Sequence, residues 1–294
     1  MAKLSLNQAY EYARECHRRG ALDEAVGVAR QILSIDSKHW EALGLMGSIA
    51  GQRGRDEIAL KHFKTAVKIQ PGSPVIQLNL GEAYRRLGQT KAAISAFKRA
   101  ISLQPQNDRA HNNLGVAFRE MNDLKSATKH FRMAVERAPS NIDNQANLAN
   151  ALLEDGVSEE ACTLFGRLAL LAPSNAEIRL KHGTALLSQG DRAAAKVALL
   201  ESIQLDPGLS RGHDMLASII QQEGNVELAI RHYQTAINLD PAFARAHSNL
   251  GNAYITCGLL DDAVSCFVRA LELDPSLALT HDLLLYWLNY SSKV

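Results

Sequence analysis

The feature that most constrains the fold is a repeat of 34 residues that runs along nearly all of the 294-residue chain. A small residue, Gly or Ala, marks each repeat at its eighth position, and an alanine always follows at position 20. A large apolar residue stands at position 24 and a proline at position 32 in seven of the eight repeats. The invariant alanines are Ala25, Ala59, Ala93, Ala127, Ala161, Ala195, Ala229 and Ala263. Such strict self-similarity without insertions indicates a repeat architecture.

The register of these markers sets the repeat boundaries. The eight predicted repeats are residues 6–39, 40–73, 74–107, 108–141, 142–175, 176–209, 210–243 and 244–277. A ninth repeat begins at Ala278 and is cut short, so we expect residues 278–290 to form a C-terminal capping helix.

Each repeat is expected to be a pair of helices. In the third repeat, apolar residues return at helical spacing before and after Gly88. Glycine tolerates the left-handed conformation that ends a helix, and Pro105 marks the end of the second helix. The small residues at positions 8 and 20 let the two helices approach closely, and the position-24 side chain is expected to fill the space between neighbouring pairs. One pair cannot bury both of its faces, so the pairs stack as an all-α solenoid.

The pattern of small residues at positions 8 and 20, an aromatic at 24 and a proline at 32 resembles the tetratricopeptide repeat (TPR). The resemblance covers essentially the whole chain. It implies a right-handed superhelical solenoid of eight contiguous helix-turn-helix TPR units, followed by the capping helix.

No catalytic, cofactor-binding or metal-binding constellation is visible. The phosphate loop and the short metalloprotease and serine-hydrolase motifs are absent. The histidines recur at position 4, as in His111 and His213, and at position 23, as in His130 and His232. Equivalent positions of neighbouring repeats lie about 8–10 Å apart, too far for one metal ion. We therefore expect no cofactor and no enzymatic activity.

The composition argues against nucleic acid and membranes as partners. The formal net charge of +1 gives no basic field for nucleic acid or for an anionic membrane. No secretory signal or membrane-spanning run is visible. The four cysteines are scattered along the chain, and we expect them to be small buried side chains in a reducing compartment. A cytoplasmic protein that binds neither nucleic acid nor membrane is expected. An RNA-binding helical repeat is disfavoured because there is no continuous basic stripe.

The resemblance implies that the concave wall is lined by positions 2, 5, 6, 9, 12 and 13 of each first helix. Asparagines gather there, and a ladder of amides can hold an extended peptide by its backbone. Two alternative explanations are that the asparagines are solvated polar surface residues, or that they bond to neighbouring helices. The predicted peptide-binding residues are Asn79, Asn112, Asn113, Asn147, Asn150, Asn249 and Asn252, flanked by Arg85, Arg109 and Arg119.

The favoured function is a protein–protein interaction scaffold that holds an extended peptide or partner protein. The alternative comes from a resemblance of residues 110–139 and 246–275 to the repeat arm of bacterial O-linked N-acetylglucosamine transferase-like (SPINDLY-type) glycosyltransferases. That resemblance implies an arm that presents protein substrates to a catalytic domain beyond residue 294.

The last helix departs from the polar outer face of a terminal cap. Its positions 2, 6, 9 and 13 are Leu279, Leu283, Tyr286 and Tyr290, where the earlier repeats are mostly polar. We expect this apolar end to dock against another protein surface, either a following domain or a second chain in a homodimer.

Overall fold

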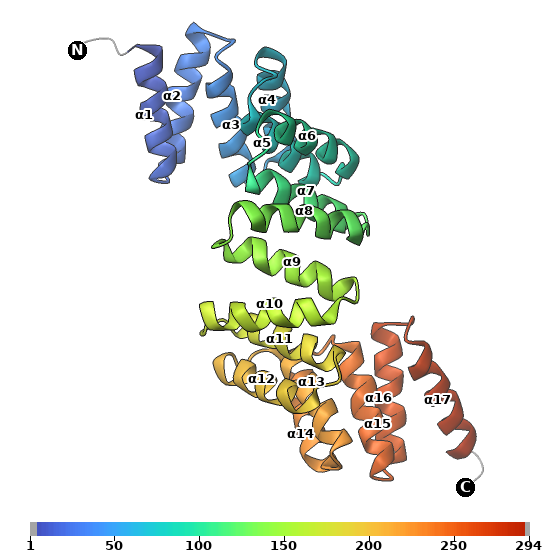
Figure 1. The fold of residues 1–294 in the computed structure, drawn as a ribbon. Helices are drawn as coiled ribbons and strands as arrows, with labels where there is room; N and C mark the ends of the chain where they lie inside the picture. Colours follow the sequence, from blue (N-terminus) through green and yellow to red (C-terminus); the bar gives the residue numbers. More distant parts are fainter. Residues whose placement is uncertain (1–4, 292–294) are drawn as a thin grey trace. The chain divides into compact units, whose positions relative to one another are not determined.

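The computed structural model describes residues 5–291, with side chains as far as residue 287. Over that range the chain forms seventeen α-helices joined by short turns and contains no strand (Figure 1). The predicted all-α class is therefore confirmed. The helices group into two compact units, divided between Asp155 and Gly156.

The N-terminal unit, residues 1–155, holds the first nine helices. They are α1 (Leu6–Arg18), α2 (Leu22–Ile35), α3 (Trp40–Gln52), α4 (Asp56–Ile69), α5 (Pro74–Arg86), α6 (Thr90–Leu103), α7 (Asp108–Glu120), α8 (Leu124–Arg137) and α9 (Ile142–Glu154).

The C-terminal unit, residues 156–294, holds the remaining helices. They are α10 (Ser158–Leu171), α11 (Ala176–Ser188), α12 (Arg192–Leu205), α13 (Ser210–Gln222), α14 (Val226–Leu239), α15 (Ala244–Thr256), α16 (Leu260–Leu273) and α17 (Ala278–Ser291). We call the odd-numbered helices A helices and the even-numbered ones B helices.

The ends of the helices have local causes. Several A helices begin after a side chain that accepts a hydrogen bond from the first turn, as Ser73 does for α5 and Asn107 for α7. Seven of the A helices are followed by a glycine with a positive φ, between 69° and 90°. After α7, Asn122 stands at that place, with φ 60°. Gly and Asn tolerate this left-handed backbone best, so the chain can leave one helix and turn into the next.

In four of the pairs, the two helices meet where a glycine faces an aromatic ring. A Cβ atom on Gly81 would lie 2.4 Å from the ring of Phe97, and one on Gly115 would lie 2.7 Å from the ring of Phe131. Both rings are fully buried. The glycine therefore leaves the space that the ring of the same pair occupies. The close approach of the paired helices depends on that missing side chain.

The same ring also belongs to the contact between successive pairs. Phe97 packs in one cluster with Leu114 and Ala110 of α7, the A helix of the next pair. In addition, successive A helices of the N-terminal unit contact one another, from α1 to α3 and onward to α9. The A helices thus lie side by side, and their side chains at matching positions form one continuous surface.

Candidate protein-binding groove

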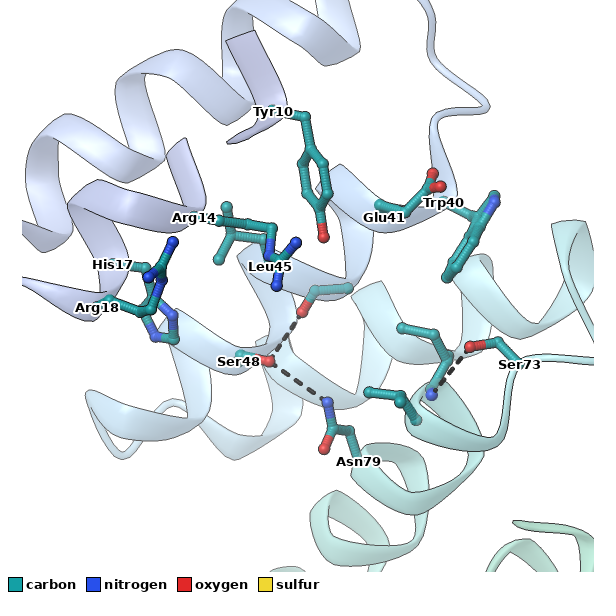
Figure 2. A pocket seen from close by; sticks show the side chains of 13 residues that line it. Tyr10, Arg14, His17, Arg18, Trp40, Glu41, Leu45, Ser48, Ser73 and Asn79 are labelled. Atoms are coloured by element: carbon teal, nitrogen blue, oxygen red, sulfur yellow. Dashed lines mark hydrogen bonds between the residues drawn. The ribbon is translucent and has the colours of Figure 1, made fainter. Parts of the chain in front are cut away.

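Three adjoining cavities open on the A helices of the N-terminal unit. The first has a volume of about 400 Å³ and is lined from α1, α3 and α5. Its walls are largely apolar, with Tyr10, Trp40 and Leu45 among them. Figure 2 shows Tyr10 and the arginines Arg14 and Arg18 on one side of this cavity and Trp40 on the other.

The second and third cavities have volumes of about 250 and 290 Å³. Both are lined by Asn79, Glu82, Arg86 and Arg109. Asn79 also lines the first cavity, and Ser48 lines the first and the second. The three cavities therefore adjoin one another along α1, α3, α5 and α7, and residues of α4 also line the second. We call them together the A-helix groove.

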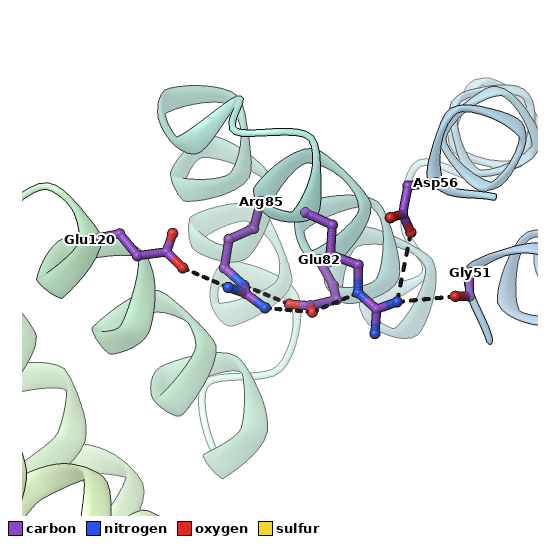
Figure 3. A network of polar contacts seen from close by, with 6 residues as sticks. Gly51, Asp56, Glu82, Arg85 and Glu120 are labelled. Atoms are coloured by element: carbon purple, nitrogen blue, oxygen red, sulfur yellow. Dashed lines mark hydrogen bonds and ion pairs between the residues drawn. The ribbon is translucent and has the colours of Figure 1, made fainter. Parts of the chain in front are cut away.

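A network of ion pairs forms one wall of the A-helix groove (Figure 3). Glu82 accepts hydrogen bonds from Arg85 at 2.8 and 2.9 Å and from Arg86 at 3.1 Å. Arg85 also pairs with Glu120, and Arg86 lies 3.6 Å from Asp56. Burial alone would raise the pKa of Glu82, but the two guanidinium groups outweigh it and hold that pKa below its usual value.

Arg109 differs from these two arginines. Its side chain is exposed, lines both the second and third cavities, and forms no ion pair with any residue that the structure describes. Arg85 and Arg86 are held by carboxylates of the same wall, so they are poorly placed to meet a ligand. Arg109 is the cation of this wall that remains available.

The structure brings together four of the predicted peptide-binding residues in the third cavity. Its lining includes Asn79, Asn113, Arg85 and Arg109. The other predicted residues lie outside the three cavities. Asn147 and half-buried Asn150 belong to α9. Asn112 and half-buried Arg119 belong to α7, and Asn249 and Asn252 lie on α15.

The asparagine amides also connect neighbouring A helices. The Nδ2 of Asn147 donates to Oδ1 of Asn112 at 2.9 Å. In the C-terminal unit, the Nδ2 of Asn249 donates to Asp214 at 2.8 Å, and in the groove the Nδ2 of Asn79 lies 3.5 Å from the Ser48 hydroxyl. Bonding to neighbouring helices, one of the two explanations left open by the sequence, is therefore present for these asparagines.

The apolar end of the A-helix groove was missed by sequence reasoning. Tyr10, Gly44 and Leu45 occupy positions 5 and 6 of their repeats, where later repeats mostly carry other residues. That departure is the signal that could have revealed it. Arg14 and Arg18 of α1 line this cavity as well.

Two histidine pairs were also missed. The Nδ1 atoms of His111 and His130 lie 3.3 Å apart, and those of His213 and His232 lie 3.1 Å apart. The repeat register relates histidines at like positions in different repeats. These pairs instead join positions 4 and 23 of the same repeat. In each pair the Nε2 of the A-helix histidine also bonds to a proline carbonyl, at 3.2 and 3.3 Å.

The geometry of the pairs favours a hydrogen bond over metal binding. The ring centroids are 5.5 Å apart for His111 and His130, so the two Nδ1 atoms point almost straight at each other. One nitrogen donates while the other accepts, which keeps the pair neutral. Burial and the neighbouring His111 lower the pKa of His130 to about 4. Across the described residues, no cluster of three or more His, Cys, Asp or Glu side chains could hold a metal ion.

The cysteines are all free thiols, but they are not uniformly buried. Cys16 is buried, Cys162 and Cys266 are partly buried, and Cys257 is exposed, so the expectation of four buried side chains is wrong for Cys257. Burial raises the pKa of the Cys266 thiol to about 11, which keeps it protonated and weakly reactive at neutral pH.

The predicted apolar end lies on α17. Leu279 and Tyr286 are 80% and 61% exposed, while Leu283 is half-buried. The side chain of Tyr290 lies outside the described residues. The ring of Tyr286 meets Trp287 edge-on at 5.0 Å. Between residues 5 and 291, no helix is both long and apolar enough to cross a membrane.

Stacked helix pairs with a groove on their A helices define the class of helical-repeat solenoid proteins. Family models give the more specific assignment. Models described as "TPR repeat" match residues 81–122 and 220–258, and models described as "Tetratricopeptide repeat" match 108–141, 176–209 and 244–277. Together they cover slightly more than half of the chain. The protein belongs to the tetratricopeptide repeat family.

Solved structures share this fold at low sequence identity. A chain of the APC/C hetero-tetramer Cut9-Hcn1 is 16% identical with a TM-score of 0.66; the match covers 91% of this protein and 52% of that chain. PilF of Pseudomonas aeruginosa is 18% identical with a TM-score of 0.65, over 72% of this protein and 97% of PilF. A tetratricopeptide repeat protein of Parabacteroides merdae is 15% identical with a TM-score of 0.59, over 84% and 98%.

These likenesses show the fold alone. The protein spans about half the length of the Cut9-Hcn1 chain that it matches. A comparison with curated proteins finds no match. None of the comparisons supports the expected resemblance to the glycosyltransferase arms.

Proposed function

We propose that this protein is a non-catalytic protein-interaction scaffold of the cytoplasm, and that the A-helix groove holds an extended segment of a partner protein. The observation that carries the proposal is that three adjoining cavities on successive A helices all have Asn79 in their lining. In the same proposal the eight helix pairs are eight TPR units with the boundaries given above, from residue 6 to residue 277, followed by the capping helix at 278–290.

The asparagines give the groove its means of holding a backbone. Where Nδ2 faces a neighbouring helix, as in Asn79, the amide oxygen is the atom offered to a ligand. Amide oxygens accept hydrogen bonds from peptide N–H groups without reading side chains. The side-chain amide of Asn113 forms no hydrogen bond with any described residue and lines the third cavity, so the whole amide is available to a ligand.

The test is to select peptides from a random phage-displayed library on the wild-type protein and to measure their affinity by fluorescence anisotropy. Replacing Asn79, Asn113 and Asn147 together by Ala is expected to weaken binding at least tenfold, since each lost hydrogen bond costs about 1 kcal/mol. The control is Asn238→Ala, an exposed amide on α14. Unchanged affinity in the triple variant, with the helical circular dichroism spectrum intact, would contradict the assignment.

The second candidate, a substrate-presenting arm of a glycosyltransferase, rests on the asparagines and on the apolar end of α17. No comparison favours it, and the asparagines are explained equally well by contacts between helices. The scaffold is therefore the function that we propose.

We also propose that the exposed face of α17 is covered by another protein surface. The 80% exposure of Leu279 supports this, because large apolar side chains at the end of a repeat stack are usually capped. A second copy of the chain is the occupant that can be tested with purified protein. Light scattering should show a dimer that dissociates in the variant L279E/Y286E. A monomeric wild-type protein would rule out that occupant.

A further inference from the structure

We infer that the A-helix groove selects a partner segment of defined chemistry, an extended acidic peptide with one bulky apolar side chain. The apolar side chain enters the first cavity, and a carboxylate further along meets Arg109. This inference rests on the proposed scaffold function and names its partner class.

The first cavity is built to take an apolar side chain. Gly44 has no side chain, and a Cβ there would lie 2.5 Å from Cδ1 of Ile76, so the two helices sit close together below the cavity. The aromatic rings of Tyr10 and Trp40 line the same cavity (Figure 2). Val75 at the rim is 57% exposed. A hollow of about 400 Å³ with such walls has room for one large apolar side chain, which gains by leaving water.

The charge around the groove favours an acidic segment. The residues that line the three cavities include five arginines and three carboxylates, and the latter are Glu41, Asp56 and Glu82. Arg14 and Arg18 also pair with Glu11 and Glu15 of their own helix, but all four side chains are more than 40% exposed. Such exposed pairs are weak, so a ligand carboxylate can compete for either arginine.

Arg109 is the strongest anchor for that carboxylate. It has no carboxylate partner among the described residues, whereas Glu82 holds Arg85 and Arg86 in the same wall. A cation without a partner loses no existing ion pair when it binds a ligand. Figure 3 shows how Glu82 engages the arginines of α5 and so leaves them occupied.

The two anchors are separated by a length that one extended segment can span. The first cavity lies over α3, and Arg109 lies on α7, two A helices further on. Packed helices lie about 8–10 Å apart, and an extended chain advances about 3.3 Å per residue. The apolar residue and the acidic residue are therefore expected about five or six residues apart in the partner.

An acidic peptide fits this surface better than a nucleic acid. Tight nucleic-acid binding needs several phosphate contacts from free cations. The groove offers one arginine without a partner, Arg109, and two arginines in weak exposed pairs, Arg14 and Arg18, while Glu82 holds Arg85 and Arg86. Binding of RNA is therefore an outcome that would contradict the inference.

The experiment uses the full-length protein and the random-peptide phage library of the previous section. Peptides selected on the wild type should share a bulky apolar residue and an Asp or Glu about five or six residues away. Selection on Arg109→Glu should lose the acidic residue, and selection on Val75→Asp should lose the apolar one. Arg211→Glu is the matched control, because Arg211 occupies the same repeat position as Arg109, is exposed, and lines none of the three cavities.

The same peptides give a quantitative readout. Arg109→Glu should weaken the best wild-type peptide about tenfold or more, while Arg211→Glu should change its affinity less than about twofold. Circular dichroism confirms folding, and Arg109→Gln provides a milder variant with the same expected direction. This inference would be overturned if the selected peptides lacked the acidic and apolar pair, or if Arg109→Glu and Arg211→Glu lost equal affinity. Either result would leave the scaffold function standing. Failure to select any peptide would count against the scaffold function as well. Salt-sensitive binding of poly-uridylate RNA that is lost in Arg109→Glu would reassign the surface to nucleic acid.

Discussion

At the scale of single residues, the contacts between position 8 and position 24 show why glycine recurs in this chain. Helical glycine is usually a cost, about 1 kcal/mol relative to alanine. At Gly81 that cost is outweighed, since a Cβ would lie 2.4 Å from the Phe97 ring. At Gly27, in α2, an added Cβ would meet nothing within 4 Å. The same substitution should therefore have opposite signs at the two sites.

We predict that Gly81→Ala destabilises the protein by about 1–3 kcal/mol because the crowded ring must shift. Gly27→Ala should stabilise it by up to about 1 kcal/mol, through helix propensity alone. Urea denaturation followed by circular dichroism measures both. Equal shifts of the midpoint in the two variants would mean that the packing of the helix pair is not as described.

The histidine pairs predict a dependence of stability on pH. The pKa of His130 is about 4 in the folded protein and about 6.5 in an unfolded chain, so the unfolded state binds more protons between these values. The free energy of unfolding should be highest above about pH 6.5 and fall towards pH 4, by at most about 1.4 kcal/mol per pH unit for one proton. Because the ring is half-exposed, solvent screening limits the pKa shift, so the total loss of stability is smaller than this slope would give over the whole interval.

In the variant His130→Gln, the free energy of unfolding should depend less on pH between 4 and 6.5, because position 130 no longer carries an imidazole that can be protonated. The matched control is His281→Gln, at an exposed site on α17. Urea midpoints measured at intervals between pH 4 and pH 7 give the comparison. A profile of His130→Gln that parallels the wild type would show that the pair does not titrate in this way.

At the scale of the helices, the turn from A helix to B helix depends on the left-handed residue after each A helix. Gly88 has φ 69° and Asn122 has φ 60°. An alanine at Gly88 should cost about 1–2 kcal/mol, because a Cβ is unfavourable in that conformation. A glycine at Asn122 should be neutral or slightly stabilising. Thermal unfolding measures both changes, and a neutral Gly88→Ala would contradict this account of the turn.

The helices were predictable because their signals are local. The spacing of apolar residues, the glycine at position 15 and the proline at position 32 all act within one repeat, so the all-α class followed from the sequence. The histidine pairs did not. His111 and His130 meet because of the rotation of one helix about its axis relative to the other, which the register of a repeat does not determine.

At the scale of the whole molecule, the candidate site was only partly predictable. The asparagines and Arg109 were predicted as binding residues from the positions that the TPR resemblance places on the concave wall. The structure brings Asn79, Asn113 and Arg109 together around one cavity. The apolar cavity was not foreseen, because it results from a side chain that is absent at Gly44 and from neighbours that fail to fill the space. Such hollows depend on the packing of three helices together and leave little trace in a sequence.

The central claim is that the A-helix groove of the N-terminal unit holds an extended partner segment. The most direct measurement is photo-crosslinking of a selected peptide that carries a benzoyl-phenylalanine at its apolar position, with mass spectrometry of the products. The account predicts crosslinks to α1, α3 and α5, at residues such as Tyr10 and Leu45 around the first cavity. Crosslinks confined to B helices, or to the C-terminal unit, would contradict it.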